Sequence, residues 1–387
     1  MDPLAPELDA DVAPTRRDPE VSVPAPARVV RAPRDPRPIS LALQGGGALG
    51  AYTWGVLEAL LARPDLPIDL VSGTSAGALN GAVLASALAS GGRRHARDAL
   101  ESFWRSVAAP PSQSLFRAMM GPVGGMVTEG VRQWLFGGAM LSPYQTDPLD
   151  LNPLRQAIAA HVDVEALRAR RGPQLFVTAT HVRTGLPRVF GGAEISIDAL
   201  LASACLPQLF RAVEVDGEPY WDGGYVGNPT LWPLVRHGRA RDLVLVQLAP
   251  DRRDALPRSN AAIRQRAAEI VFNSSLVAEM QAIQALRELS PADATPGGTG
   301  SPFHAIRFHR LGPPPAEVLE RPGASLDRSW EWISALRDAG RDATRRFLRR
   351  DGPKLGRTST LDIGQAYGIG RKPRIHLPAG DTLEARP

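Results

Sequence analysis

Two short apolar segments near the start of the chain each end in a glycine-rich turn, and each turn leads into a stretch with helical character. The first segment, ISLAL at residues 39–43, precedes QGGGALG and an amphipathic stretch over residues 51–63. The second, at residues 68–72, precedes GTSAG and an alanine-rich stretch that starts near Ala76. Parallel strands need a crossover connection, which a helix usually provides. The sequence therefore predicts an α/β fold whose mostly parallel central sheet carries helices on both faces.

Later strand-like segments continue this sheet along the chain, at residues 174–180, 186–190 and 242–248. We therefore place a main α/β domain at residues 39–250. Within it, residues 106–150 are rich in Gly, Pro, Met and aromatic residues, which indicates an insertion or a lid. The aromatic and Met residues at 116–140 suit an acyl pocket, a membrane contact or ordinary core packing.

The two ends of the chain differ from this domain in composition. Residues 1–38 hold nine prolines and thirteen charges without an apolar period, which predicts a disordered arm. Residues 251–350 form a mainly helical extension, with helices expected over 258–290 and 327–350 and a strand within 302–310. The tail at 351–387 is punctuated by Gly and Pro, and we expect it to be loosely attached.

Composition narrows the class of protein and its compartment. The chain has 387 residues, is 43% hydrophobic and carries a net charge of +5 spread along its length, which favours a solvated surface over a nucleic-acid site. A single cysteine, Cys205, forms no internal disulfide. The acidic, proline-rich start is not typical of a secretory signal, and no apolar run is long enough to span a bilayer. We expect a cytoplasmic protein whose contact with a membrane, if any, is peripheral; the oligomeric state is left open.

The pattern Gly-x-Ser-x-Gly places Ser75 at the junction of a strand and a helix. A nucleophile at such a sharp turn adopts strained backbone angles, and only small neighbours such as Gly73 and Gly77 let the strand and helix pass closely. The helix behind Ser75 also directs its N-terminal N–H groups towards a developing oxyanion. This context favours a catalytic serine over an ordinary loop residue.

The glycine turn at Gly45, Gly46 and Gly47 has three interpretations. No Gly-Lys-Ser/Thr follows, which excludes a phosphate loop. A dinucleotide fingerprint fits the glycine spacing but needs an acid at the end of the second strand, where the GTSAG turn lies instead. The third interpretation is an oxyanion hole made by these backbone N–H groups, because neighbouring parallel strands present their C-terminal turns at the same sheet edge.

A serine nucleophile needs a base, and Asp222 in EPYWDGGYVGNP is a better candidate than the histidines. It lies between Trp221 and the glycines Gly223 and Gly224, and partial desolvation by aromatic neighbours would strengthen its carboxylate as a base. A turn aspartate that caps its own backbone is the structural alternative. None of the seven histidines has an obviously catalytic setting: His95, His161, His181, His237, His304, His309 and His376.

With these pieces in order, the chain resembles the patatin-like phospholipase family of serine acyl hydrolases. The matching segments are LALQGGGALGAYTWGVLEAL, VSGTSAGALNGAVLA and LLASACLPQLFRAVEVDGEPYWDGGYVGNP, within residues 39–250. The resemblance implies a three-layer sandwich with a nucleophile elbow, a Ser75–Asp222 dyad and an oxyanion hole at Gly45, Gly46 and Gly47. One departure is Leu49, where many members have Arg or Lys. Cys205, in the ASACLP segment, is expected to be a buried structural thiol.

The expected activity is hydrolysis of glycerolipid carboxylic esters through an acyl-enzyme, with a lipid or another ester as substrate and no cofactor or metal. Two alternatives stay open. The first is an esterase or an intracellular polyester depolymerase acting on non-phospholipid esters, including a triad enzyme that uses His304 or His309. The second is a non-catalytic lipid-binding protein on the same fold. A nicotinamide enzyme is the least favoured.

Overall fold

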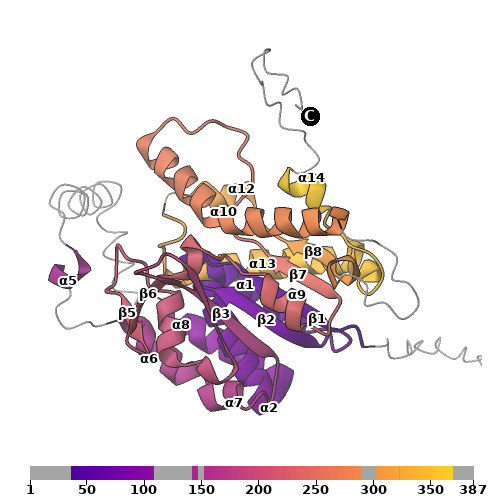
Figure 1. The fold of residues 1–387 in the computed structure, drawn as a ribbon, viewed down its shortest axis with the longest axis horizontal. Helices are drawn as coiled ribbons and strands as arrows, with labels where there is room; N and C mark the ends of the chain where they lie inside the picture. The colour runs from indigo at the N-terminus through magenta and orange to yellow at the C-terminus, as the bar shows by residue number, and fades with distance from the viewer. Residues whose placement is uncertain (1–35, 109–141, 147–151, 290–301, 322, 369–387) are drawn as a thin grey trace, which may run out of the picture. The chain divides into compact units, whose positions relative to one another are not determined.

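The computed structural model describes residues 36–108, 142–146, 152–289, 302–321 and 323–368 (Figure 1). Most of the predicted arm and of the predicted insertion, including the aromatic and Met residues at 116–140, lies outside the described residues, as do residues 369–387. Within them, the fold is an α/β sandwich around one eight-stranded sheet. The predicted fold class is confirmed.

The central sheet is parallel in its middle and antiparallel on one side. The strands are β1 (Ile39–Leu43), β2 (Ile68–Thr74), β3 (Gln174–His181), β4 (Pro187–Gly191), β5 (Val213–Val215), β6 (Glu218–Asp222), β7 (Asp242–Val246) and β8 (Arg307–Leu311). Their order is β5-β6-β3-β2-β1-β7-β8, and β4 also pairs with β3. Strands β3, β2, β1, β7 and β8 pair in parallel, whereas β4, β5 and β6 form antiparallel pairs. The parallel strands therefore end at one common edge.

Helices cover the two faces of this sheet (Figure 1). The first face packs against α1 (Gly50–Leu61), α2 (Ala76–Val107), α6 (Pro153–His161), α7 (Val164–Arg168), α8 (Ile197–Ser203) and α13 (Trp330–Arg350). The second packs against α9 (Trp232–His237), α10 (Asn260–Leu289), α11 (Pro302–Ala305) and α14 (Ile363–Tyr367). Helices α5 (Pro143–Thr146) and α12 (Ala316–Leu319) are short. No helix among these described elements is both long and apolar enough to cross a membrane.

Helices α1 and α13 cross at two glycines, which brings the C-terminal part of the chain into the core. A side chain at Gly55 would collide with the Arg337 carbonyl, and one at Gly340 with the Tyr52 carbonyl. The two backbones can approach closely only because both positions lack a Cβ. Residues 39–61 and 330–350 are therefore parts of one core.

The sheet continues past residue 250, the predicted end of the main domain, into the predicted C-terminal extension of the core. Strand β8 extends the sheet beyond β7, with Val246 opposite Leu311. The predicted loose tail is also folded up to residue 368, because Leu355, Ile363 and Tyr367 are buried. The N–H groups of Thr360 and Leu361 both donate to the carbonyl of Phe308 in β8. Short turns that bury single apolar residues look like a tail in composition, since they have neither a helical nor a strand period.

At the other end, Arg37 belongs to the folded domain and not to the predicted arm. Its guanidinium donates to the carbonyls of Gly352 and Leu355, each at 3.1 Å, and to the Asp65 carboxylate at 2.9 Å. Arg37, two residues before β1, is thus held by the same C-terminal segment that packs on β8.

Candidate active site

Ser75 lies between β2 and α2 in a strained backbone conformation. Its φ of 54° and ψ of −127° are values that residues with a side chain rarely adopt. The first helical hydrogen bond of α2 runs from the Leu79 N–H to the Ser75 carbonyl at 3.0 Å, so the free N–H groups of the first turn lie directly behind the serine. This is the geometry of a nucleophile elbow.

The two glycines of the pattern have no room for a side chain. A Cβ at Gly73 would lie 2.6 Å from the Gly77 carbonyl oxygen, and a Cβ at Gly77 would collide with the carbonyl of Leu43 in β1. Strand β2, helix α2 and strand β1 can therefore converge at the elbow only with glycine at both positions. The structure thus gives the spacing a steric cause.

The sheet register brings Asp222 to the level of Ser75. Thr74 lies opposite Thr178 in the parallel pair of β2 and β3, and the next residue of β3, Ala179, lies opposite Asp222 in β6. Ser75 follows Thr74 as Ala179 follows Thr178, so serine and aspartate extend from neighbouring strands at one edge. They are 147 positions apart in the sequence.

The carboxyl group of Asp222 is fully buried and only half satisfied. Its Oδ1 accepts a hydrogen bond from the Gly224 N–H at 2.7 Å, and its main-chain carbonyl accepts one from the Thr180 hydroxyl. Its N–H donates to the Cys205 carbonyl at 2.7 Å. The other carboxyl oxygen, Oδ2, accepts no hydrogen bond of ordinary geometry from any described residue. Oδ2 is therefore the atom free to take a proton.

Burial raises the pKa of Asp222 to about 6, and the Ser75 hydroxyl and the Gly224 N–H oppose this rise. Ser75 is thus the side chain whose hydroxyl lowers the pKa of this carboxyl group. A carboxylate with a pKa close to the pH of the cell is a better proton acceptor than an exposed aspartate.

The glycine turn lies directly against the serine. A Cβ at Gly45 would be 2.8 Å from the Cβ of Ser75, so the turn and the elbow are in contact. The Gly45 N–H, however, already donates to the side-chain Oδ1 of Asn228 at 2.7 Å. The Gly45 N–H is therefore already bonded in this structure, and its role as an oxyanion donor stays a prediction. The N–H groups of Gly46 and Gly47 donate to no described residue.

Asn228 is a site residue that the sequence analysis did not single out. Besides accepting from Gly45, it donates from Nδ2 to the Phe272 carbonyl at 3.2 Å. Its main-chain N–H donates to the Ser275 hydroxyl, and its carbonyl accepts from the Gln44 side chain. The residue thus joins the glycine turn to helix α10. The GNP tripeptide after the two glycines was the signal that could have identified it.

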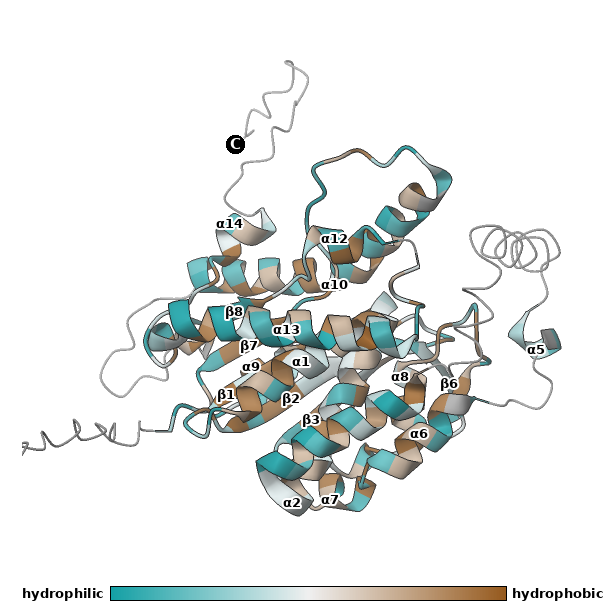
Figure 2. Ribbon diagram, turned by 180° about the vertical axis from the view of Figure 1, so that it is seen from behind, coloured by the Kyte–Doolittle hydropathy of each residue, from teal (hydrophilic) through white to brown (hydrophobic). Residues whose placement is uncertain are grey.

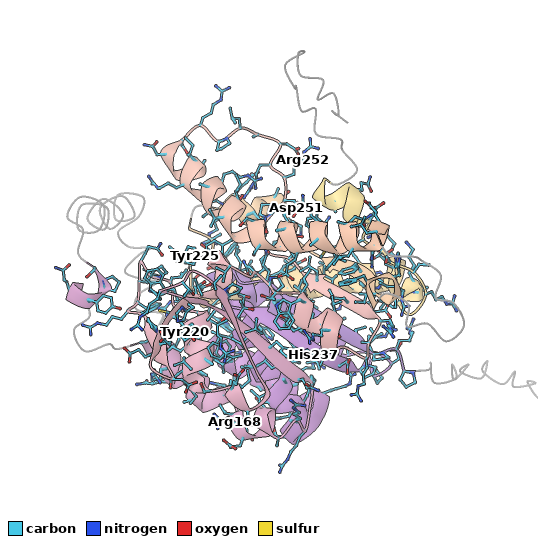
Figure 3. All side chains as sticks on the ribbon, viewed as in Figure 1. Arg168, Tyr220, Tyr225, His237, Asp251 and Arg252 are labelled. Carbon is cyan, nitrogen blue, oxygen red and sulfur yellow. The ribbon has the colours of Figure 1, made fainter. Side chains whose placement is uncertain are left out.

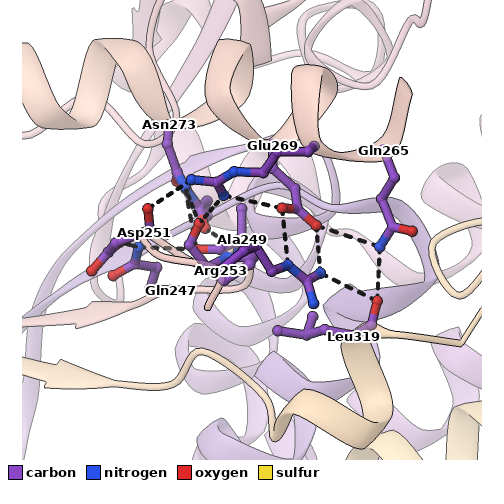
Figure 4. A network of polar contacts seen from close by, with 11 residues as sticks. Gln247, Ala249, Asp251, Arg253, Gln265, Glu269, Asn273 and Leu319 are labelled. Atoms are coloured by element: carbon purple, nitrogen blue, oxygen red, sulfur yellow. Dashed lines mark hydrogen bonds and ion pairs between the residues drawn. The ribbon is translucent and has the colours of Figure 1, made fainter. Parts of the chain in front are cut away.

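Gln44 and Asn273 complete this connection. The side-chain Oε1 of Gln44 accepts from the N–H groups of Leu248 and Ala249, and its Nε2 donates to Asn273 Oδ1 at 2.8 Å. Asn273 in turn donates to the Pro250 carbonyl, within the polar network that joins α10 to the loop after β7 (Figure 4). The ends of β1 and β7 are therefore bound to α10.

Ser203 fixes the backbone of the nucleophile from the other side. Its hydroxyl accepts from the Ser75 N–H at 2.9 Å and donates to the Thr178 carbonyl at 2.6 Å. Ser203 lies in the ASACLP segment, in which the sequence analysis identified only Cys205. Cys205 itself is buried, as predicted.

The histidine of the triad alternative lies in a different environment. His309 is buried in β8, with Nε2 2.9 Å from Asp242 Oδ1 and Nδ1 3.0 Å from the Thr360 hydroxyl. Both of its ring nitrogens are therefore occupied away from Ser75. His304 lies in α11, which packs against α9 and α10.

Comparison with known proteins identifies the family. Residues 41–235, half of the chain, match the profile of the family described as patatin-like phospholipase. The chain belongs to this family. The resemblance predicted from the motifs is confirmed, and the family region contains Ser75, Asp222 and Asn228.

The uncharacterized protein YjjU of Escherichia coli (strain K12) is 26% identical over 224 residues, which are 56% of this chain and 54% of YjjU. The chain thus spans about half the length of this relative. Two solved structures are similar. VipD from Legionella pneumophila has a TM-score of 0.33 and 16% identity, over 79% of this chain and 67% of VipD. The heterodimeric ExoU–SpcU complex from the type III secretion system of Pseudomonas aeruginosa has a TM-score of 0.32 and 15% identity, over 87% of this chain and 58% of the matched chain.

Proposed function

We propose that the protein is a serine acyl hydrolase that cleaves the carboxylic esters of lipids by a Ser75–Asp222 dyad. The observation that supports this most strongly is the pairing of a strained serine with a buried carboxylate that has one unbonded oxygen. Both features destabilise a folded protein, and neither helps a protein that only binds lipid. Membership of the patatin-like phospholipase family supports lipid esters as the substrate class.

In the first half of the reaction, Asp222 Oδ2 takes the proton of the Ser75 hydroxyl as Oγ attacks the ester carbonyl carbon. The carbonyl oxygen becomes an oxyanion. The N–H groups of Gly46 and Gly47, and that of Ala76 at the start of α2, are the donors we assign to it. The tetrahedral intermediate then expels the alcohol of the lipid, which takes the proton from Asp222. An acyl-enzyme on Ser75 remains.

In the second half, a water molecule replaces the alcohol. Asp222 takes a proton from this water as its oxygen attacks the acyl-enzyme, and the same oxyanion donors bind the second tetrahedral intermediate. Collapse breaks the bond to Ser75 Oγ, which recovers its proton from Asp222. The fatty acid leaves, and the enzyme returns to its starting state.

The direct test is a panel of phospholipids, neutral glycerolipids and short-chain esters assayed with the wild-type protein and with Ser75→Ala. We expect the variant to fold normally and to lose about 10³-fold or more in activity. A fluorophosphonate should label Ser75, as read by peptide mass spectrometry. Retention of more than about a tenth of the activity would contradict the assignment of the nucleophile.

A further inference from the structure

Helix α10 extends past the edge of the sheet that carries Ser75. Its C-terminal half packs on the sheet through the buried residues Leu276, Met280 and Ile283. Near its end, Arg287 donates to the Ile306 carbonyl, just before β8 begins. In the middle of the helix, Asn273 binds Gln44 at the opposite edge, where β1 ends. The helix therefore runs from the carboxyl edge of the parallel strands to their amino edge.

Residues Asn260–Val271 lie N-terminal to these edge contacts. At about 1.5 Å per residue, these twelve residues add roughly 18 Å of helix on the N-terminal side of the site, and Arg266 on their inner side donates to the carbonyls of Pro250 and Asp251 (Figure 1). Phe272, the next residue, packs against Gly224, two positions from Asp222. Its ring centroid is 5.4 Å from that of Tyr225, which is labelled in Figure 3. The projecting half of α10 thus begins beside the dyad.

The outer face of this projecting half is apolar. Ile263, Ile270 and Val271 are 48%, 53% and 45% exposed, and Leu256 in the preceding loop is 77% exposed. Positions 263, 270 and 271 share one side of a helix, opposite Phe272 and Leu276. Figure 2 shows hydrophobic and hydrophilic residues side by side along α10. Several large apolar side chains on one exposed face indicate an interaction surface.

The charge around this face is positive. Residues 255–268 contain three arginines and no acid. Arg258 and Arg264 are exposed and form no ion pair with any residue that the structure describes. The nearest acid along the helix, Glu269, is held by Arg253 at 2.6 Å and by Arg266 at 3.1 Å (Figure 4). A partner for this face therefore needs both apolar material and negative charge.

We propose that Leu256, Ile263, Ile270 and Val271, together with Arg258 and Arg264, form a docking face for an anionic lipid bilayer. The apolar side chains enter the boundary between headgroups and acyl chains, and the two arginines bind lipid phosphates. Docking in this way holds the carboxyl edge of the sheet, and with it Ser75, towards the lipids. The lipid substrate in this argument rests on the proposed function, whereas binding to the bilayer itself does not.

The test compares three proteins by sedimentation with vesicles of phosphatidylcholine and phosphatidylglycerol, and with vesicles of phosphatidylcholine alone. The first is the wild type and the second carries Ile263→Asp and Ile270→Asp. The third carries Leu286→Asp and Leu289→Asp, at the other end of the same helix, where Leu289 is 83% exposed. Each is also assayed on a soluble short-chain ester and on the vesicle lipids, after a melting curve has established its folding.

We expect the wild type and the third protein to bind the anionic vesicles, and the second to bind about tenfold or more weakly. An Arg258→Ala, Arg264→Ala variant should lose most of the preference for anionic vesicles. Activity of the second protein on the soluble ester should equal that of the wild type, while its activity on vesicles falls with binding.

Three results would overturn the docking face. One is absence of vesicle binding by the wild type, and another is equal loss of binding in the variants at both ends of α10. The third is a wild type that is a dimer on analytical ultracentrifugation and a second protein that is a monomer but binds vesicles as the wild type does. This result would assign the face to a second copy of the chain. Vesicle binding without hydrolysis of any ester would instead contradict the proposed function and leave the docking face in place.

Discussion

The N–H of Gly45 donates to the side chain of Asn228 at 2.7 Å, across 183 residues of sequence. This bond joins the turn after β1 to the loop that follows Asp222, so the two halves of the candidate site are held together by one asparagine. It also leaves Gly46 and Gly47 as the residues of the glycine turn whose N–H groups are not bonded to any described residue. We therefore expect Asn228 to act on the proposed reaction through the turn, as a positioning residue.

Replacement of Asn228 by alanine should lower kcat without raising KM. Because the turn loses its support, we expect the misplaced Gly46 and Gly47 donors to reduce kcat about 10- to 100-fold. The affinity for a boronic acid, which mimics the tetrahedral intermediate, should fall in parallel. Ser275→Ala is the matched control, since it removes another bond to Asn228 but leaves Gly45 bound. A loss of activity that merely followed the melting temperature would reduce Asn228 to a structural role.

The activity should depend on pH through Asp222. The carboxylate must be ionised to take the serine proton, and its pKa is raised to about 6 by burial. We therefore expect kcat/KM to rise with pH through about 6 and to level off above it. A profile measured with a short-chain ester between pH 4 and 9 checks this. An acidic limb near pH 4 would show that the essential carboxylate is not a buried one.

The same shift predicts that Asp222→Asn stabilises the fold at alkaline pH. The folded pKa lies above the ordinary value of 3.8, so the native state binds more protons than the unfolded state between about pH 4 and 6, and stability falls as pH rises through this range. The variant avoids this loss, and it should gain up to about 3 kcal/mol at pH 8. Its advantage in urea unfolding should shrink towards pH 4. Equal stability of the two proteins at every pH would show that the carboxylate is not desolvated.

A dyad and a triad predict different effects of histidine replacement. We expect Asp222→Asn to be as inactive as Ser75→Ala, and the double variant to be no worse than either, because both groups act in one proton transfer. His309→Gln should lower the melting temperature, since His309 binds Asp242 and Thr360, yet keep substantial activity. Alanine at each of the other histidines should also leave substantial activity. One normally folded histidine variant as inactive as Ser75→Ala would establish a triad.

The close approach at the elbow makes Gly77 intolerant of any side chain. Gly77→Ala should destabilise the protein by more than about 2 kcal/mol, because its Cβ would meet the carbonyl of Leu43 and the backbone cannot yield cheaply. Gly364→Ala in α14 is the control, since the nearest atom to its Cβ would be 3.4 Å away. Chemical denaturation of the two variants measures the difference. Similar midpoints would mean that β1 and α2 can separate without cost.

The sequence was sufficient for the features that depend on local patterns. The two strand-turn-helix units predicted the parallel sheet, and the rule that parallel strands end at one edge predicted that the glycine turn meets Ser75. The contributions of Ser203 and Asn228 could not be predicted, because a hydrogen bond between a side chain and a distant backbone group leaves no period in the sequence. The bond that holds the Gly45 N–H could not be predicted for the same reason, since its partner lies 183 residues away.

The match to the family ends at residue 235, but some of the side chains that hold the site together lie beyond this residue. Asn273 and Ser275 of α10 bind Gln44 and Asn228, and β8 pairs with the whole length of β7. A polypeptide cut near residue 250 would keep Ser75 and Asp222 yet leave β7 as a bare apolar edge, open to pairing with other chains. We therefore expect the part of the chain that matches the family not to fold as an active unit by itself. The shortest fragment expected to keep the site intact extends through the segment that packs on β8, up to about Gly368.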